Sequence, residues 1–160
     1  MVLPFVREIL ADLEHSEPFE RVRRHLSAGT GRRRVSGLTF TARALYLPYL
    51  VRAAANPCLI IVADNKAAEA LHAAVTSAAE LTGALEASAV LRLPAHDVLP
   101  FENLSPHPEI QETRAATLWK ITAHKSAPRL IIAPIEAACM KLFPRDYYRA
   151  LALHLRVGEE

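Results

Sequence analysis

Apolar residues follow two different spacings along this chain. In some stretches they recur every three or four residues, as Val6, Leu10 and Leu13 do, which is typical of a helix with one buried face. In others they form short continuous runs rich in β-branched residues, which are typical of strands covered on both faces of a parallel sheet. The expected helices are residues 2–26 (interrupted at 16–18), 41–55, 66–81, 109–123 and 134–142, and the expected strands are 34–38, 58–63, 89–93 and 130–133.

Residues at the ends of these segments support the same division. Asp64 or Asn65 can cap the helix that follows, and Gly83 can end it. Pro48 is expected to kink its helix, whereas Pro134 suits a first helical turn, where its missing N–H costs nothing. Strands that alternate with helices predict an α/β fold with a mainly parallel sheet flanked by helices.

The two ends of the chain differ from this alternating middle. Leu151, Leu153 and Leu155 alternate with polar or small residues, which predicts a half-buried strand with no evident partner. We therefore expect three parts: an N-terminal helical segment over residues 1–33, an α/β domain over 34–149, and the truncated start of a following module over 150–160.

Residues 94–108 form a proline-rich connection, which is the least generic stretch of the sequence. Its four prolines disfavour helix at the residues that precede them. Val98, Leu99, Phe101 and Leu104 are apolar and are expected to anchor the connection to the body of the domain. Side chains with metal-binding atoms lie in the same connection and at the residue after it: His96, Asp97, Glu102, His107 and Glu109. Their spacing matches no zinc pattern, so we expect no metal site.

Composition adds little to the picture. The 160 residues are 51% hydrophobic and 22% charged, which is ordinary for one globular domain with a core. The start of the chain carries no secretory signal, and no apolar run reaches the ~20 residues needed to span a bilayer. Cys58 and Cys139 lie in apolar surroundings and are expected to be buried free thiols. We therefore expect a cytoplasmic protein with no membrane partner.

The net charge of +2 does not by itself indicate nucleic-acid binding, but the basic residues are unevenly placed. Six arginines crowd together in the first quarter: Arg21, Arg23, Arg24, Arg32, Arg33 and Arg34, with Arg7 further towards the start. Arg32, Arg33 and Arg34 are candidates for contact with DNA phosphates, which gives a salt-dependent affinity. The alternative is a solvated face or a docking surface for another domain.

One turn is spaced like a phosphate-binding loop, which has the pattern G-x-x-x-x-G-K-[ST] between a strand and a helix. In such a loop, backbone N–H groups and the lysine hold the phosphates, and the Ser/Thr hydroxyl binds Mg²⁺. The corresponding positions in this chain are Gly37, Thr39, Thr41, Ala42, Arg43 and Ala44. Only the first glycine of the pattern is kept.

The three replacements remove different parts of the chemistry. Ala44 offers no oxygen to a metal, Ala42 disfavours a positive φ, and Arg43 keeps the charge without the compact ammonium group. We therefore expect no catalytic residue and no cofactor in this segment. An ordinary strand-to-helix turn is the plainer interpretation, and residual anion binding by Arg43 at the helix N-terminus stays open.

Three stretches carry a family resemblance: "LPAHDVLPFENLSPHPEI", "ETRAATLWKI" and "LIIAPIEAACMKLFPRDYY". Together with the altered loop after Gly37, they resemble the N-terminal region of transcription-repair coupling factors, over residues 35–160. That region is related to the repair protein UvrB, so the resemblance implies a P-loop-NTPase-like fold (like domain 1a of UvrB) with a degenerate phosphate loop. UvrB also has a tyrosine-rich hairpin that probes damage, where this chain has only Phe101.

The resemblance also implies a role for the longer protein. Such factors displace stalled RNA polymerase, move on DNA with a separate motor that uses ATP and Mg²⁺, and recruit UvrA through a module that would begin near Ala150. This segment would then be a non-catalytic scaffold that docks against other domains of its own chain. Two alternatives stay open: a nucleotide-dependent helicase or UvrB-type ATPase domain, and a DNA-binding module that uses the N-terminal arginines.

Overall fold

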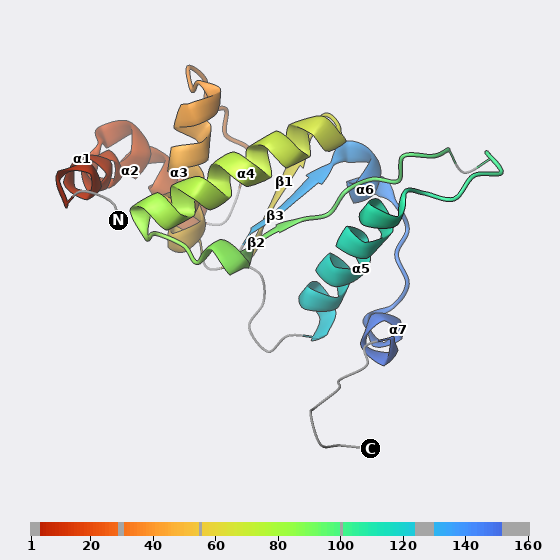
Figure 1. The fold of residues 1–160 in the computed structure, drawn as a ribbon. Coiled ribbons are helices and arrows are strands. Elements are labelled where there is room, and N and C mark those ends of the chain that lie inside the picture. Colours follow the sequence, from red (N-terminus) through yellow and green to blue (C-terminus); the bar gives the residue numbers. More distant parts are fainter. Residues whose placement is uncertain (1–3, 29–30, 55, 100, 124–129, 152–160) are drawn as a thin grey trace.

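The computed structural model describes residues 4–28, 31–54, 56–99, 101–123 and 130–151. Helices and strands alternate through the middle of the chain, as the sequence predicts (Figure 1). The elements in order are α1 (Pro4–His15), α2 (Glu17–Ser27), α3 (Phe40–Ala53), β1 (Cys58–Val62), α4 (Asn65–Thr82), the 3₁₀ turn η1 (Ala87–Ala89), β2 (Val90–Arg92), α5 (Pro108–Ala123), β3 (Leu130–Pro134), α6 (Ile135–Cys139) and α7 (Arg145–Ala150).

The three strands form one parallel sheet in the order β1-β3-β2. Leu130 at the start of the central strand β3 is in register with Cys58 of β1 and with Val90 of β2. Helix α4 leads from β1 to β2, and α5 leads from β2 to β3, so each parallel pairing is made across helical connections. The predicted α/β fold with a mainly parallel sheet is thereby confirmed.

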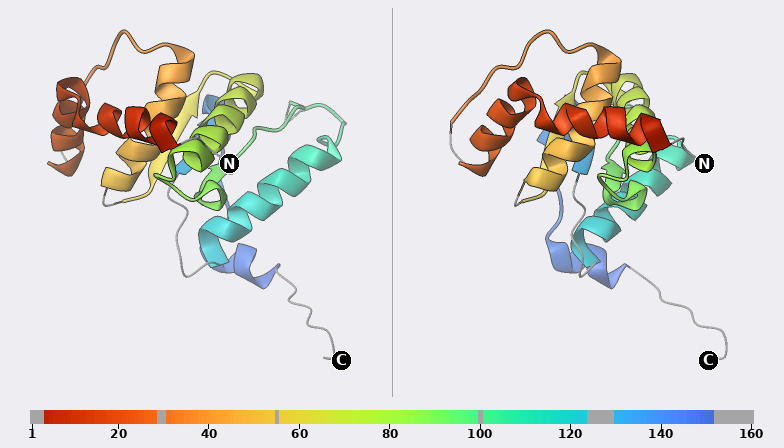
Figure 2. Two further views of the ribbon diagram at one scale, coloured as in Figure 1. Left: turned by 60° about the vertical axis from the view of Figure 1, so that its left-hand side comes forward. Right: turned by 90° about the vertical axis from the view of Figure 1, so that its left-hand side faces the viewer.

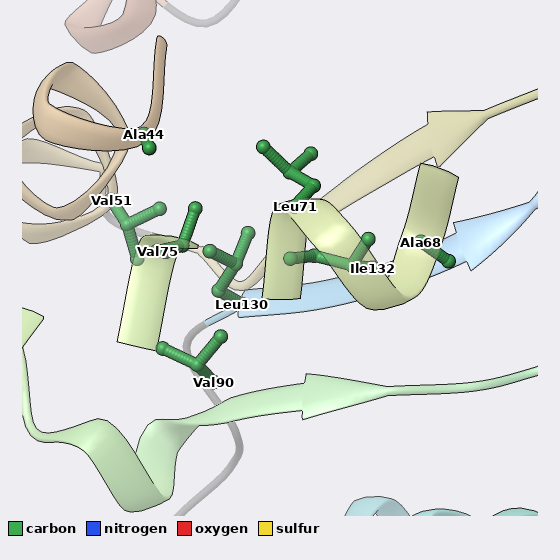
Figure 3. Close-up of a cluster of buried hydrophobic side chains, with 8 residues drawn as sticks. All are labelled: Ala44, Val51, Ala68, Leu71, Val75, Val90, Leu130 and Ile132. Carbon is green, nitrogen blue, oxygen red and sulfur yellow. The ribbon is translucent and has the colours of Figure 1, made fainter. Parts of the chain in front are cut away.

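Helix α4 covers one face of this sheet (Figures 1 and 2). Both of its predicted ends are confirmed: the Asp64 carboxylate accepts a hydrogen bond from Ala67 N at 2.7 Å, and Gly83 ends the helix with a φ of 65°. Buried side chains from α3, α4, β2 and β3 meet beneath it (Figure 3). These are Ala44, Val51, Ala68, Leu71, Val75, Val90, Leu130 and Ile132.

The other face of the sheet is covered only in part. Leu118 of α5 and Ala137 of α6 pack against Ala133 of β3, whereas no buried cluster of the described residues includes Leu59 or Ile61 of β1. Leu59 and Ile61 are consequently 54% and 52% exposed. The prediction that residues 58–63 are buried on both faces is therefore wrong, because β1 is an edge strand and helices cover the sheet over β2 and β3.

The N-terminal helices pack beside α3 (Figure 2). Ser16 separates α1 from α2, as predicted. Phe19 of α2 is buried against Tyr46 and Tyr49 of α3, with ring centroids 5.6 Å and 6.2 Å away. An ion pair between Arg52 and Glu14 joins α3 to α1. The division into parts at residues 33 and 149 stays a prediction.

The strand expected over residues 34–38 is absent. These residues form irregular, mostly exposed backbone, and Gly37 has a φ of 82°. The physical reason is that Val35 and Leu38 are the only apolar side chains in a segment that follows three arginines, so it has too little apolar surface for a buried strand. Helix α3 is therefore entered from a loop.

The region after β3 also differs from expectation. Helix α6 ends at Cys139 instead of near residue 142, and Pro134 is its N-cap residue. Cys139 is exposed and Cys58 is half-buried, so the prediction of two buried thiols is wrong; neither forms a disulfide in the described part of the chain. Helix α7 was not expected, and Leu151 follows it as an exposed residue. The rest of the predicted terminal strand, residues 152–160, lies outside the described part of the chain.

Candidate functional site

The altered phosphate loop lies at the N-terminus of α3. Thr39 is the N-cap residue: its Oγ1 accepts a hydrogen bond from Ala42 N at 3.2 Å, and its carbonyl accepts one from Arg43 N at 3.0 Å. N–H groups at the start of a helix are the donors that an anion would use. The Thr39 hydroxyl thus already occupies one of those donors, Ala42 N, while the bond from Arg43 N is the first regular hydrogen bond of the helix.

Ala44 lies on the inward side of the same helix turn. It is 3% exposed and belongs to the core cluster beneath α4 (Figure 3). A working phosphate loop has its Mg²⁺-binding hydroxyl at this position. Thr41 and Arg43 are exposed, and Ala42 is half-buried. The turn therefore contributes an alanine to packing at the point where nucleotide chemistry requires an oxygen.

A cavity of about 430 Å³ lies beside this turn, between α2, residues 35–38 and α3. The polar side chains that line this cavity are Ser36, Arg43 and Tyr46. The rest of its lining is Pro18, Phe19, Val22, Val35, Gly37, Leu38, Leu47 and Leu50. A triphosphate needs many hydrogen-bond donors and a metal ion held by oxygen atoms. This cavity provides mainly apolar surface instead.

The N-terminal arginines divide into two groups. Arg21 and Arg23 form ion pairs with Glu17 and Glu20 at 2.7 Å and 2.8 Å, on the surface of α2. Arg32, Arg33 and Arg34 are exposed, and the structure shows no ion pair for them with any described residue. Arg33 and Arg34 line a second cavity, of about 550 Å³, together with Arg21 and His25.

Polar contacts hold the base of the proline-rich connection. The Asn65 amide bonds to both Ala95 N and Ala95 O, at 2.8 Å and 3.0 Å. Thr117 Oγ1 donates to Arg92 O at 2.7 Å. On the far side, His107 N donates to the Asp97 carboxylate at 3.0 Å, which brings the two ends of the connection together.

The predicted apolar anchors do not hold this connection. Phe101 is 82% exposed, Leu99 and Leu104 are also exposed, and only Val98 is half-buried. The connection extends away from the body of the domain beyond the N-terminal end of α5 (Figure 1). The prediction is wrong because the polar contacts at the base fix where the chain leaves and returns, while the apolar residues lie outside that base.

The sequence analysis missed a pocket of about 970 Å³ between α5, residues 140–143 and α7. The rings of Phe143 and Tyr147 stack at 4.4 Å, and the Tyr148 hydroxyl accepts a hydrogen bond from Phe143 N at 3.1 Å. Arg114 lines the pocket and is only 6% exposed. The sequence signals only the burial of Arg114, which stands four residues before Leu118 on the apolar side of α5.

Burial governs the electrostatics of this pocket. Desolvation lowers the pKa of the Arg114 guanidinium, which still stays protonated at neutral pH. Burial, and secondly the nearby charge of Arg114, lower the pKa of His96, so this imidazole is disposed to be neutral.

In the described part of the chain, no group of three or more His, Cys, Asp or Glu side chains is placed to hold a metal ion. No helix among these residues is long and apolar enough to cross a bilayer.

The fold defines a parallel α/β domain in which helix α3 is capped by Thr39 and packs Ala44 into the core. No protein-family model and no solved structure matches the chain. A transcription-repair-coupling factor from Myxococcus xanthus is 34% identical over 143 residues, which cover 89% of this chain and 12% of that protein. The factors from Escherichia coli and Bacillus subtilis are 24% and 23% identical, over 88% and 92% of this chain.

The chain is therefore a sequence relative of the transcription-repair-coupling factors, and the resemblance is confirmed. The 143-residue match is longer than residues 35–160, so it also reaches into the N-terminal helices. The chain spans about 12% of the length of each of these relatives.

Proposed function

We propose that this chain is a scaffold segment of a transcription-repair coupling factor and has no nucleotide chemistry of its own. The proposal rests on the hydrogen bonding and the packing at the N-terminus of α3. Thr39 caps the helix and Ala44 packs in the core, at positions where a nucleotide enzyme has loop backbone and a metal ligand. The same turn that would bind phosphate therefore holds α3 against the sheet.

Two apolar surfaces support a docking role. The first is the open side of β1, where Leu59 and Ile61 are exposed on an edge strand. The second is the tip of the proline-rich connection, with Leu99, Phe101 and Leu104. Exposed apolar patches and open strand edges commonly mark interaction surfaces. In the longer protein, we assign both surfaces to contacts with other domains of the same chain.

The wider role follows from the family. The names of the relatives connect transcription with repair. For the longer protein we therefore propose RNA polymerase and DNA as partners, UvrA as a partner through a module that begins near residue 150, and a separate motor that uses ATP and Mg²⁺. We propose a cytoplasmic location for it. The present segment would position the UvrA-binding module.

Amide hydrogen exchange tests the docking role. We expect slower exchange over β1 and over residues 97–107 in a longer coupling factor that contains this segment than in the 160-residue chain alone. Helix α4 is the internal control, because its inward side chains are already buried and its exchange should match in both samples. Equal exchange rates over β1 and the connection in both proteins would contradict the docking role.

A second candidate function is contact with the DNA backbone. It is favoured by Arg32, Arg33 and Arg34, which are exposed, lack ion pairs among the described residues, and include two that line the cavity beside α2. Such contacts are electrostatic and independent of base sequence.

A further inference from the structure

The pocket between α5, residues 140–143 and α7 has apolar walls and only basic charges. Its aromatic lining comes from Trp119, Phe143, Tyr147 and Tyr148, and its aliphatic lining includes Leu118 and Leu142. Arg114 and Lys141 contribute positive charge. Among the lining residues, all of which lie in the described part of the chain, none carries a carboxylate.

Arg114 gives this pocket a buried cation with unused hydrogen-bonding capacity. Its Nη1 donates to the Pro94 carbonyl, and no carboxylate among the described residues forms an ion pair with it. A guanidinium has five N–H donors, and buried charges are normally paired. The side chain is 6% exposed and lines the cavity, so an anion that enters the pocket would supply the missing counter-charge.

We propose that this pocket binds a peptide segment that presents a carboxylate beside an apolar or aromatic side chain. The carboxylate pairs with Arg114, and the neighbouring side chain packs on the stacked rings of Phe143 and Tyr147. Recognition of this kind combines a charge-assisted hydrogen bond with an aromatic-lined surface. The site lies apart from the α3 turn, and peptide binding here does not depend on the scaffold role.

A peptide fits these walls better than a nucleic acid does. A single strand of DNA or RNA needs a basic groove that follows successive phosphates, together with stacking platforms. Here Lys141 is the one lysine or arginine besides Arg114 along the pocket, and Met140, Leu142 and Leu151 provide aliphatic surface. That surface suits side chains such as leucine and phenylalanine.

Tryptophan fluorescence tests the proposal, because Trp119 lines the pocket and is the single tryptophan of the chain. The probes are the acetylated and amidated peptide Leu-Asp-Phe-Asp-Leu and its neutral counterpart Leu-Asn-Phe-Asn-Leu. We expect saturable binding of the acidic peptide to the 160-residue chain. We expect the neutral peptide to bind about tenfold more weakly, the size of one lost charge-assisted hydrogen bond.

Two variants locate the binding. Phe143→Ala removes an exposed wall of the pocket. It should weaken binding of the acidic peptide by about fivefold or more, within the range measured for aromatic contacts. Phe101→Ala is the matched control, because that ring is exposed at the tip of the distant connection and should change nothing. Arg114→Lys should remove most of the preference for the acidic peptide, since lysine lacks the planar fork. Denaturant titration of each variant establishes that it is folded.

Three results would overturn the proposal. The first is equal binding of the acidic and neutral peptides. The second is an equal loss of binding in Phe101→Ala and Phe143→Ala. The third is a fluorescence response to oligothymidylate with none to the peptides, which would make the pocket a nucleic-acid site. If Arg114→Lys does not fold, the two peptides and the two phenylalanine variants still decide the outcome.

Discussion

At the scale of single residues, Ala44 and Thr39 have structural roles at the start of α3. Ala44 is 3% exposed within a cluster of aliphatic side chains, so a serine or threonine there would place a hydroxyl in apolar surroundings. Thr39 contributes a hydroxyl, but that oxygen accepts the hydrogen bond that caps α3. These two residues stabilise the helix and its packing, and neither is free to hold a metal–phosphate complex.

His72 makes stability depend on pH. Its Nε2–H donates to the Val90 carbonyl at 3.2 Å, and burial is the main cause that lowers the pKa of the imidazole. The folded chain therefore binds this proton less readily than the unfolded chain, in which a histidine has a pKa of about 6.5. Stability from the neutral imidazole is present above that value and is lost as the pH falls through it.

We accordingly expect the free energy of unfolding, measured by urea titration, to decrease between about pH 7.5 and pH 5.5. The His72→Gln variant keeps a side-chain donor but does not titrate, so its decrease should be smaller. His96 has a pKa lowered mainly by burial and should account for part of what remains. An unchanged pH dependence in His72→Gln would contradict this role.

At the scale of elements, α4 is the helix that the sequence specifies best, because a capping residue precedes it and a glycine ends it. Replacing Asp64 with alanine leaves the Ala67 N–H without its capping oxygen, whereas asparagine retains an acceptor. We expect Asp64→Ala to lower the free energy of unfolding by about 1 kcal/mol and Asp64→Asn by much less. Urea denaturation measures both; equal losses in the two variants would show that the cap contributes nothing.

Local patterns could predict the helices because their signals lie within each segment. Helix α2 after Ser16, helix α4 between Asp64 and Gly83, and the parallel strands β1 and β3 were all predicted from neighbouring residues. The burial of a strand is different, since it depends on which strands and helices lie beside it. The pattern predicts Leu59 and Ile61 as core residues, but they are exposed because no described element buries them on their face of the sheet.

The candidate site shows the same limit. The missing lysine and hydroxyl at Arg43 and Ala44 could be identified from the sequence, since a motif has fixed spacing. The pocket around Arg114 could not be identified from the sequence, because it forms where α5 meets α7. Residues 145–150, which form α7, carry no strong helical pattern. The exposure of Phe101 could not be predicted either. An apolar residue in a loop is expected to pack on the domain, and only the path of the loop shows whether it does.

At the scale of the whole molecule, the described surface exposes apolar side chains in several places. The chain corresponds to about 12% of each relative, and it exposes apolar side chains on β1, on the proline-rich connection and around α7. A small net charge of +2 accompanies a local group of exposed arginines near residue 33. Both the apolar surfaces and the arginine group are therefore places where contacts with other molecules or domains are expected.

The arginine group makes a prediction that salt can test. If Arg32, Arg33 and Arg34 each contact a phosphate of duplex DNA, a plot of log affinity against log salt concentration should have a slope of about −2.7. The triple alanine variant should lose this binding, whereas Arg23→Ala should have a smaller effect because Arg23 is paired with Glu20. Affinity measured by fluorescence anisotropy that does not change with salt would exclude DNA contact by these residues.

We propose that this chain has no nucleotide chemistry of its own, and titration with a fluorescent ATP analogue in the presence of Mg²⁺ tests that claim. We predict no saturable binding at micromolar concentrations, and no difference between the unmodified chain and Arg43→Ala, because the α3 N-terminus is capped by Thr39 and Ala44 offers no metal ligand. Micromolar, Mg²⁺-dependent binding that Arg43→Ala abolishes would contradict the claim.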